Sequence, residues 1–292
     1  MRQSDAARLV ALSAIWGASF IFIRVLAPVL GPVLTVTTRV LIGGAILIVY
    51  CRVIGLDAGL SRHWRQYAVI GGTNSTLPFM LFAFAALHLP ASYSVILNAM
   101  TPLFTALLAV PLLGERLTAA KVAGLVVGVA GVALVSGAGP VVPDLWFAFA
   151  VAACLGATLC YAGSSIYMKR YASGAKPLAI AGWSQIFAGV ALVPFVPFAP
   201  PTGSITPLIV ANVLALAVVC SSAAYALYYR LIADIGPTRA LTMAFLMPVF
   251  GMLWGALFLG ETITLPMIAG CGLVIGGATI VLRPAPAHRR RS

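Results

Sequence analysis

Ten apolar runs divide this chain, and each is about as long as a helix that crosses a lipid bilayer. They cover residues 7–26, 33–53, 65–87, 91–112, 118–136, 145–168, 177–198, 207–230, 238–259 and 264–283. A spanning helix needs about 20 apolar residues to cross a hydrocarbon core of about 30 Å, so the runs use nearly the whole chain. Lipid offers no partners for unpaired backbone amides, and the alternation of a transmembrane barrel is absent from the pattern. The sequence therefore predicts an all-α integral membrane protein with ten transmembrane helices.

The composition supports lipid as the solvent. Of 292 residues, 62% are hydrophobic and 8% are charged, whereas soluble domains carry roughly 25% charged residues. The net charge of +12 could suggest nucleic acid as a partner, but the basic residues lie between the apolar runs, which is the pattern of membrane orientation. The first run begins at Ala6, is as long as a full span and lacks a small-residue cleavage site, so we expect a retained helix. The five cysteines show no CxxC spacing, and no metal or cofactor is expected.

Lys and Arg collect on one side when the N terminus, every second connection and the C terminus are placed together. That side receives 16 of the 18 basic residues, and Arg24 and Arg39 are the two exceptions. The 16 are Arg2, Arg8, Arg52, Arg62, Arg65, Arg116, Lys121, Lys169, Arg170, Lys176, Arg230, Arg239, Arg283, Arg289, Arg290 and Arg291. Because cytoplasmic loops carry the excess of basic residues, both termini are expected in the cytoplasm of a bacterial-type inner membrane, with residues 284–292 as a basic tail.

The chain also repeats itself. A shift of 146 residues lays Pro102, Phe104, Gly114, Glu115, Thr118, Gly124 and Gly131 on Pro248, Phe250, Gly260, Glu261, Thr264, Gly270 and Gly277. A shift of 145 lays Pro32 and Gly44 on Pro177 and Gly189, and the stretch from Trp16 to Arg24 on that from Tyr161 to Lys169. Five helices separate the copies, and five is odd, so equivalent helices must cross in opposite directions. The sequence predicts two inverted five-helix repeats, residues 1–139 and 140–283, which is how many secondary transporters build two gates.

Several of these residues resemble a known family. They are the run from Ala14 to Phe20 ending in Arg24, Arg39, and the two Pro and Leu-Gly-Glu pairs, Pro102 with Leu113-Gly114-Glu115 and Pro248 with Leu259-Gly260-Glu261. They look like the duplicated EamA unit of the drug/metabolite transporter superfamily, and the ten-helix layout is similar to the YddG-type amino-acid exporters. The resemblance covers essentially the full chain. It implies a basket of helices around a central cavity, with helices 1 to 4 and 6 to 9 lining it and helices 5 and 10 outside.

The acidic residues are few and lie at termini or connections. They are Asp5, Asp57, Glu115, Asp144, Asp234 and Glu261. Proton-coupled exporters of cationic drugs place a carboxylate inside the bilayer, where the cost of a charge marks function. The predicted spans hold none, which favours an uncoupled facilitator or exchanger. Glu115 and Glu261 each follow a glycine and are predicted to cap the turn before the next helix.

Polar and aromatic residues at helical spacing form the faces of the predicted cavity. The substrate-binding candidates are Trp16, Ser19, Arg39, Asn74, Ser75, Pro78, Phe79, Phe82, Asn98, Tyr161, Ser164, Ser165, Trp183, Gln185, Tyr225 and Tyr229, and Ser221 and Ser222 share the helix 8 face. Such a lining suits a solute with an apolar body and hydrogen-bonding groups. The alternative is that the polar residues bond neighbouring helices.

Arg39 is the costliest residue of the predicted spans. It could extend to the interface, or it could hold a carboxylate in the transport path, and its repeat equivalent is Ser184. Pro78, Pro102 and Pro248 interrupt spans near their middles and are either gating hinges or static kinks.

The sequence as a whole predicts a secondary transporter that exports small metabolites by alternating access. Neutral amino acids with apolar or aromatic side chains are the first choice, and a proton-coupled multidrug or metabolite exporter of the same superfamily is the alternative. An intramembrane enzyme would need a nucleophile with a base, or a metal set, inside the spans, and none is found. The expected partners are a small-molecule substrate and the bilayer, and a monomer or weak dimer is expected because the GxxxG faces of Gly124 and Gly272 leave both open.

Overall fold

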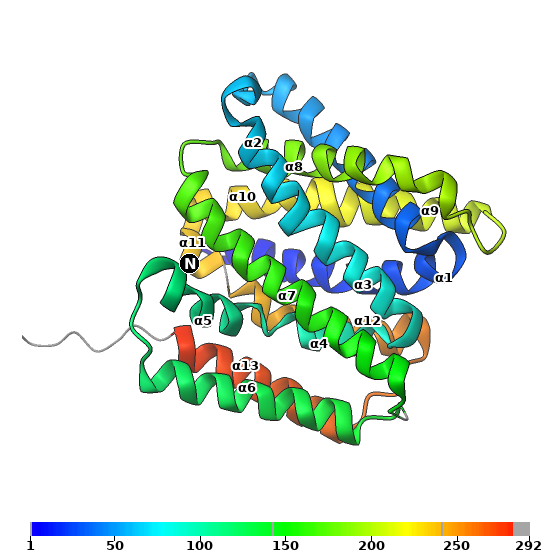
Figure 1. Cartoon of the computed structure of the whole chain (residues 1–292), viewed down its shortest axis with the longest axis vertical. Helices are drawn as coiled ribbons and strands as arrows, with labels where there is room; N and C mark the ends of the chain where they lie inside the picture. Colours follow the sequence, from blue (N-terminus) through cyan, green and yellow to red (C-terminus); the bar gives the residue numbers. More distant parts are fainter. Residues whose placement is uncertain (1, 142, 241, 283–292) are drawn as a thin grey trace, which may run out of the picture.

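The chain forms a bundle of helices that begins with a long bent helix. The computed structural model describes residues 2–141, 143–240 and 242–282, and every regular element in these ranges is helical. Helix α1 (Gln3–Val53) runs through both of the first two predicted spans and bends at Gly31, whose φ of 73° departs from helical geometry. Glycine adopts a positive φ at no steric cost, so it allows the sharp bend between the two arms, residues 3–30 and 32–53 (Figure 1). The predicted basic tail, 284–292, and Arg283 lie outside the described residues.

The remaining elements follow in short succession. They are α2 (Leu60–Ile70), η1 (Gly71–Thr76), α3 (Leu77–His88), α4 (Ala91–Asn98), α5 (Thr101–Leu113), α6 (Ala119–Ala138), α7 (Leu145–Tyr171), α8 (Pro177–Leu192), η2 (Val193–Phe198), α9 (Pro207–Leu214), η3 (Ala215–Ala223), α10 (Ala224–Ile235), α11 (Pro237–Ala240), α12 (Met243–Leu259) and α13 (Leu265–Leu282). Eight continuous helical stretches of the described chain are long and apolar enough to cross a membrane, and Met243–Leu259 is a shorter apolar helix.

Two stretches depart from α-helical geometry in the middle of a span. Residues 71–76 (η1) and 215–223 (η3) are π-helical, and each is continuous with α-helices on both sides. Shifts of 145 and 146 residues carry 71–76 onto 216–221 and 217–222, so the two π-helices occupy equivalent places in the predicted repeats. Single-turn π segments occur frequently at functional sites. The apolar periodicity alone did not reveal them.

The prolines proposed as hinges occupy three different settings. Pro78 is the second residue of α3 and follows the π-helix η1. Pro102 is the second residue of α5, just after the break between α4 and α5 at 99–100. Pro248 lies inside the continuous helix α12. The repeat-equivalent pair therefore differs in local structure, and the hinge role stays a prediction.

Glycines allow two pairs of helices to approach closely. Helices α6 and α13 lie side by side (Figure 1): a Cβ atom placed on Gly124 would lie 2.6 Å from the carbonyl oxygen of Gly277, and one on Gly131 would lie 2.6 Å from that of Gly270. The second arm of α1 packs on α8 in the same manner, since a Cβ atom on Gly44 would lie 3.0 Å from the carbonyl oxygen of Gly182. Side chains larger than hydrogen would push these helices apart.

Candidate functional site

The site is centred on Arg39, which lies on the second arm of α1 and is 5% exposed. Its Nε donates a hydrogen bond to Ser221 Oγ in η3 at 3.1 Å. Its guanidinium carbon lies 3.8 Å from the centre of the Phe79 ring in α3, a cation–π arrangement. The hydrogen bond to Ser221 is the one that the guanidinium makes within the described chain. The four N–H groups of the two terminal nitrogens are therefore free to bind an acceptor.

None of the six side-chain carboxylates neutralises Arg39, because all six are described and each is held elsewhere. Asp5 and Asp234 contact Arg8, at 3.8 and 2.6 Å. Glu115 pairs with Lys121 at 2.9 Å. Asp57 and Asp144 accept backbone N–H groups of Gly59 and Phe147 at 2.9 and 2.6 Å, and Glu261 accepts those of Ala91 and Ser92. A buried cation without a counter-charge is costly in lipid, which makes Arg39 a candidate for a functional role.

The π-helix η3 presents two serines to the second arm of α1. Ser221 and Ser222 donate to the carbonyl oxygens of Leu216 and Ala217, five residues earlier in each case, at 3.3 and 3.1 Å. Ser222 also lies 3.0 Å from the carbonyl oxygen of Gly43. The extra residue per turn of the π-helix thus brings two adjacent hydroxyls against one helix.

Aromatic side chains surround this polar centre. Tyr161 in α7 and Tyr225 in α10 lie near the Arg39 guanidinium, and Asn74 of η1 lies near the Tyr225 hydroxyl. The Trp16 ring lies 5.7 Å from that of Tyr225, and the Trp16 indole donates to the carbonyl oxygen of Cys220 at 3.1 Å.

A second aromatic group continues from Tyr161. Its ring is stacked on that of Phe82 at 6.2 Å, and Phe82 meets Phe20 edge to face at 5.2 Å. These rings provide an apolar surface next to the arginine, as a solute with an aromatic body requires.

Gln185 approaches the centre from α8. It is 1% exposed, its Nε2 donates to the carbonyl oxygen of Ala181 at 3.1 Å, and its Oε1 has no hydrogen-bond partner in the described chain. A Cβ atom placed on Gly43 would lie 3.0 Å from this oxygen and 2.9 Å from Ser221 Cβ. Gln185 and Ser221 therefore face each other across Gly43, one helical turn from Arg39.

The other predicted site residues are more dispersed. The Ser75 and Ser164 hydroxyls are buried without a partner, and Ser19 donates to Trp16 O at 2.7 Å. Ser165 is exposed and donates to its own helix at Tyr161. Trp183 packs against the hydrophobic cluster of Tyr67 and Ile70. Tyr229 stacks on Tyr225 and packs against the cluster of Leu47 and Cys51. Pro78 is buried beside Phe79, and the Oδ1 of Asn98, at the end of α4, has no hydrogen-bond partner in the described chain.

The sequence pattern does not predict every residue of the candidate site. It places Ser221 on a cavity face but not among the substrate-binding candidates, and it does not point to Phe20 or Tyr228. Tyr228 lies 5.2 Å from the Trp16 ring. Aromatic residues are common in apolar helices, so no sequence signal separated these two from ordinary core residues.

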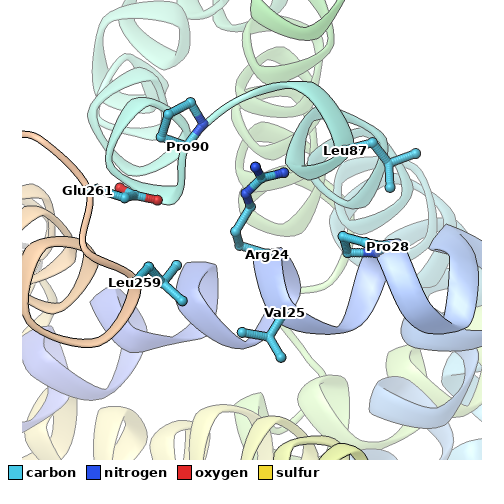
Figure 2. A pocket seen from close by; sticks show the side chains of 7 residues that line it. All are labelled: Arg24, Val25, Pro28, Leu87, Pro90, Leu259 and Glu261. Atoms are coloured by element: carbon cyan, nitrogen blue, oxygen red, sulfur yellow. The ribbon is translucent and has the colours of Figure 1, made fainter. Parts of the chain in front are cut away.

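A pocket of about 540 Å³ is lined by α1, the end of α3, the residue before α4 and the end of α12 (Figure 2). Arg24, which donates to Ala86 O, and Glu261 face each other across it. The Glu261 carboxylate accepts hydrogen bonds from Ala91 N and Ser92 N at 2.6 and 3.0 Å, so it caps α4 from the turn after α12. The predicted capping of its own turn by Glu261 is therefore wrong, because the unpaired amides of α4, which starts after Pro90, offer better partners.

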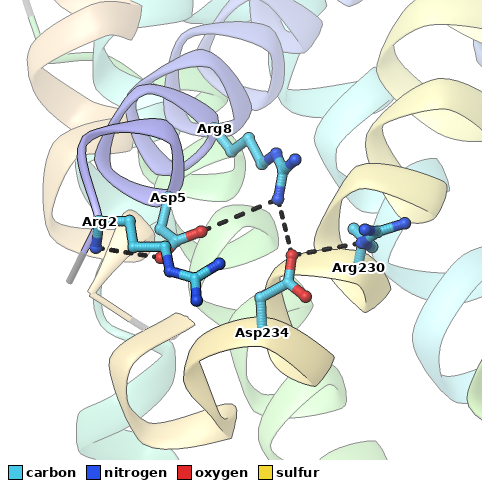
Figure 3. Close-up of polar contacts among 5 residues, drawn as sticks. All are labelled: Arg2, Asp5, Arg8, Arg230 and Asp234. Carbon is cyan, nitrogen blue, oxygen red and sulfur yellow. Dashed lines mark hydrogen bonds and ion pairs between the residues drawn. The ribbon is translucent and has the colours of Figure 1, made fainter.

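A charged network joins the start of α1 to the end of α10 (Figure 3). Asp234 Oδ2 lies 2.6 Å from Arg8 Nη1 and 3.2 Å from Arg230 Nε. Asp5 lies 3.8 Å from Arg8 Nη1 and accepts the backbone N–H of Arg2. The two helix ends therefore lie at the same end of the bundle.

Comparison with known proteins decides the family. The model of the EamA-like transporter family matches residues 6–137 and again residues 148–283. The chain belongs to this family. EamA-like proteins are transporters, so this protein is a multi-pass membrane transporter of small molecules, and it is identified as a member of the drug/metabolite transporter superfamily, as the sequence predicted.

Relatives of this EamA-like protein match over nearly their full length. The chain is 25% identical to the uncharacterized transporter YvbV of Bacillus subtilis (99% of this chain, 94% of the relative) and 24% identical to a probable terminal-alkyne amino-acid exporter of Streptantibioticus cattleyicolor (100% and 98%). It is 26% identical to protein PecM of Dickeya dadantii (95% and 92%). One solved protein crystal structure superposes with a TM-score of 0.67 at 20% identity and covers 97% of both chains, which shows a shared fold.

Proposed function

We propose that this EamA-like transporter exports neutral amino acids with aromatic or other apolar side chains. The observation that carries the proposal is the buried guanidinium of Arg39, which pairs with no carboxylate of the described residues. Its free terminal nitrogens match the two oxygens of a carboxylate, since guanidinium and carboxylate form two parallel hydrogen bonds. A substrate carboxylate would supply the missing charge.

The surroundings of Arg39 support an amino acid with an apolar body. Phe79 lies against the guanidinium, and Trp16, Phe82 and Tyr161 extend the aromatic surface from it. The Streptantibioticus relative is named as a probable terminal-alkyne amino-acid exporter, and its name describes a substrate of the same class. At 24% identity that name supports the class and not the individual substrate.

Two symmetric helix contacts support an inverted-repeat architecture with ten spans. Under the 146-residue shift Gly124 and Gly131 become Gly270 and Gly277, so the contacts of Gly124 with Gly277 and of Gly131 with Gly270 exchange. Contacts that exchange in this way are the mark of a two-fold axis, and because the pairing runs in opposite chain directions, the two helices are antiparallel. We assign the repeats to residues 1–139 and 140–283 and the two arms of α1 to separate spans.

Contacts between the second arm of α1 and α8, next to the site, also exchange under the repeat shift. The 145-residue shift carries Gly44 onto Gly189 and Val40 onto Gln185. A Cβ atom on Gly44 would lie 3.1 Å from Gln185 Cβ, and one on Gly189 would lie 3.3 Å from Val40 Cγ2. The second arm of α1 and helix α8 would thus meet on the axis that relates the two gates, as in alternating access.

The charges of the helix ends support cytoplasmic termini. Arg2, Arg8 and Arg230 gather at one end of the bundle (Figure 3), which is expected for the cytoplasmic side of an inner membrane. The six carboxylates are all held at helix ends and connections, so no acid of the described spans is available to carry a proton. We propose an uncoupled facilitator or exchanger.

Counterflow into liposomes tests the proposal. Purified protein is reconstituted into vesicles preloaded with unlabelled phenylalanine, leucine, a nucleoside or a cationic drug, and entry of the matching labelled compound is measured. We expect counterflow of the two amino acids and unchanged initial rates when the pH gradient is collapsed. Counterflow of the drug cation alone, with a strict need for a pH gradient, would identify a proton-coupled multidrug exporter instead.

A further inference from the structure

The strongest unexplained feature near Arg39 is the side-chain oxygen of Gln185. Its orientation is determined by the other end of the amide, because Nε2 donates to the carbonyl oxygen of Ala181 at 3.1 Å. Exchanging the oxygen and nitrogen would place two acceptors against each other, so Oε1 must face away from Ala181. A buried acceptor without a donor costs free energy, and such a group calls for an explanation.

The position of Oε1 relates it to Arg39. The oxygen lies 3.0 Å from the Cβ position of Gly43, which is four residues after Arg39 on the same helix. Residues four apart on a helix are neighbours on one face, with about 5–6 Å between their Cβ atoms. Ser221, which accepts from Arg39 Nε, lies against the same Cβ position at 2.9 Å. A donor of charge-assisted hydrogen bonds and a free acceptor therefore lie one helical turn apart.

We propose that Gln185 Oε1 accepts a hydrogen bond from the substrate ammonium group and selects α-amino acids over carboxylic acids that lack the amine. The inference rests on the proposed function, because it needs Arg39 to hold the carboxylate of the same molecule. In an α-amino acid a single carbon separates the two charged groups, which suits a donor and an acceptor one turn apart. A simple carboxylate bound at Arg39 would leave Oε1 without a donor, and a site that leaves a buried acceptor unpaired discriminates strongly.

One further hydroxyl is unpartnered in an element that packs on α8. Ser75 in η1 is 1% exposed, its hydroxyl oxygen has no partner in the described chain, and η1 contacts α8. Tyr161 lies near Arg39, Trp16 lies against Tyr225, and aromatic faces attract ammonium ions. The six carboxylates are held at helix ends and connections, so neutral oxygens and rings would have to meet the positive charge.

The test compares phenylalanine with 3-phenylpropionate, which keeps the carboxylate and the ring but lacks the amine. Competition against labelled phenylalanine is measured in liposomes for the wild type and for Gln185→Met, a side chain of similar length without an amide. We expect phenylalanine to be preferred about tenfold to a hundredfold by the wild type, since a hydrogen bond to a charged group is worth this much. In Gln185→Met the preference should fall to about threefold or less, through weaker phenylalanine binding.

A matched control is Gln66→Met in α2, because Gln66 Oε1 is also buried without a partner but lies outside the site. Its preference for phenylalanine should equal that of the wild type. An unchanged preference in Gln185→Met would overturn the inference and leave the proposed function standing. If the wild type transports neither compound, both are wrong.

The wild type alone keeps the inference testable if Gln185→Met does not fold. N-acetylphenylalanine carries no charge on its nitrogen and should compete as weakly as 3-phenylpropionate. Equal competition by phenylalanine and 3-phenylpropionate in the wild type would refute a role for Gln185 in recognising the amine.

Discussion

At the scale of single residues, Arg39 is both the side chain that costs the most free energy to bury and the one proposed to bind the substrate. A guanidinium that is 5% exposed, next to a phenyl ring and a serine hydroxyl, is poorly compensated for an ion in the bilayer. Stability alone would favour an apolar side chain at this position. Its presence is explained if the missing charge arrives with the substrate.

Replacement of Arg39 should therefore separate stability from transport. In Arg39→Met we expect phenylalanine transport to fall at least about tenfold, because charge-assisted hydrogen bonds to the carboxylate are lost. The thermal unfolding midpoint should stay equal or rise, since a buried uncompensated charge is removed. Arg52→Met, at the exposed end of the same helix, is the matched control and should leave transport unchanged. A lower unfolding midpoint with normal transport would show that Arg39 is an architectural residue.

The sequence is enough to single out Arg39 as a candidate site residue, but it does not reveal which side chains contact Arg39. A lone cation inside an apolar run is visible in one dimension, as are the polar residues Asn74 and Gln185. The contact with Ser221 depends on the direction in which the π-helix η3 turns its side chains. Apolar periodicity does not reveal where a π-helix lies. The sequence places Ser165 on the same predicted face as Ser164, but Ser165 is exposed, because adjacent residues of an α-helix point about 100° apart.

At the scale of elements, the two equivalent Leu-Gly-Glu turns do different things. Glu261 caps α4 through Ala91 N and Ser92 N, whereas Glu115 is exposed and pairs with Lys121 in the first turn of the following helix, α6. A cap satisfies helix amides that otherwise have no partner, while an exposed ion pair contributes little. One wall of the pocket beside Glu261 is therefore the start of α4, which Glu261 caps from another part of the chain.

This difference predicts unequal effects of the same substitution. Glu261→Gln should lower the free energy of unfolding by about 1–2 kcal/mol, since one backbone N–H of α4 loses its acceptor and the charge near the helix N terminus is removed. Glu115→Gln should change it by about 0.5 kcal/mol or less. Thermal unfolding of both variants in the same detergent measures the two effects. Equal shifts would mean that the cap on α4 adds nothing to stability.

At the scale of elements, sequence reasoning also found the helices better than their irregularities. Apolar runs bounded by charge, Gly and Pro predicted where helices lie, because lipid leaves few alternatives. The connection expected at 27–32 is instead helical up to Gly31, where α1 bends. Length and hydropathy do not distinguish a loop from a sharp bend at one glycine.

At the scale of the whole molecule, the paired glycine contacts connect the repeat in the sequence with the packing of the bundle. Helices α6 and α13 meet through glycines that the 146-residue shift exchanges, far from Arg39 in the chain. The α1 and α8 pair repeats this relation beside the site, with Arg39 on one helix and Gln185 on the other. The two halves would therefore contribute different chemistry, a donor and an acceptor, to a common centre.

The absence of a counter-ion for Arg39 among the described residues affects how fast the transporter can reorient without a bound substrate. In the proposed cycle, the carrier reorients after releasing its substrate with an unpaired guanidinium at Arg39, which is 5% exposed. An uncompensated charge inside a bilayer costs about 2.5 kcal/mol or more. We expect trans-stimulation: labelled phenylalanine should leave liposomes at least about tenfold faster into buffer containing unlabelled phenylalanine than into plain buffer. Equal release rates would show that the empty carrier reorients freely. With trans-stimulation, net export would be limited by the return stroke, and the transporter would work fastest when amino acids are present on both sides of the membrane.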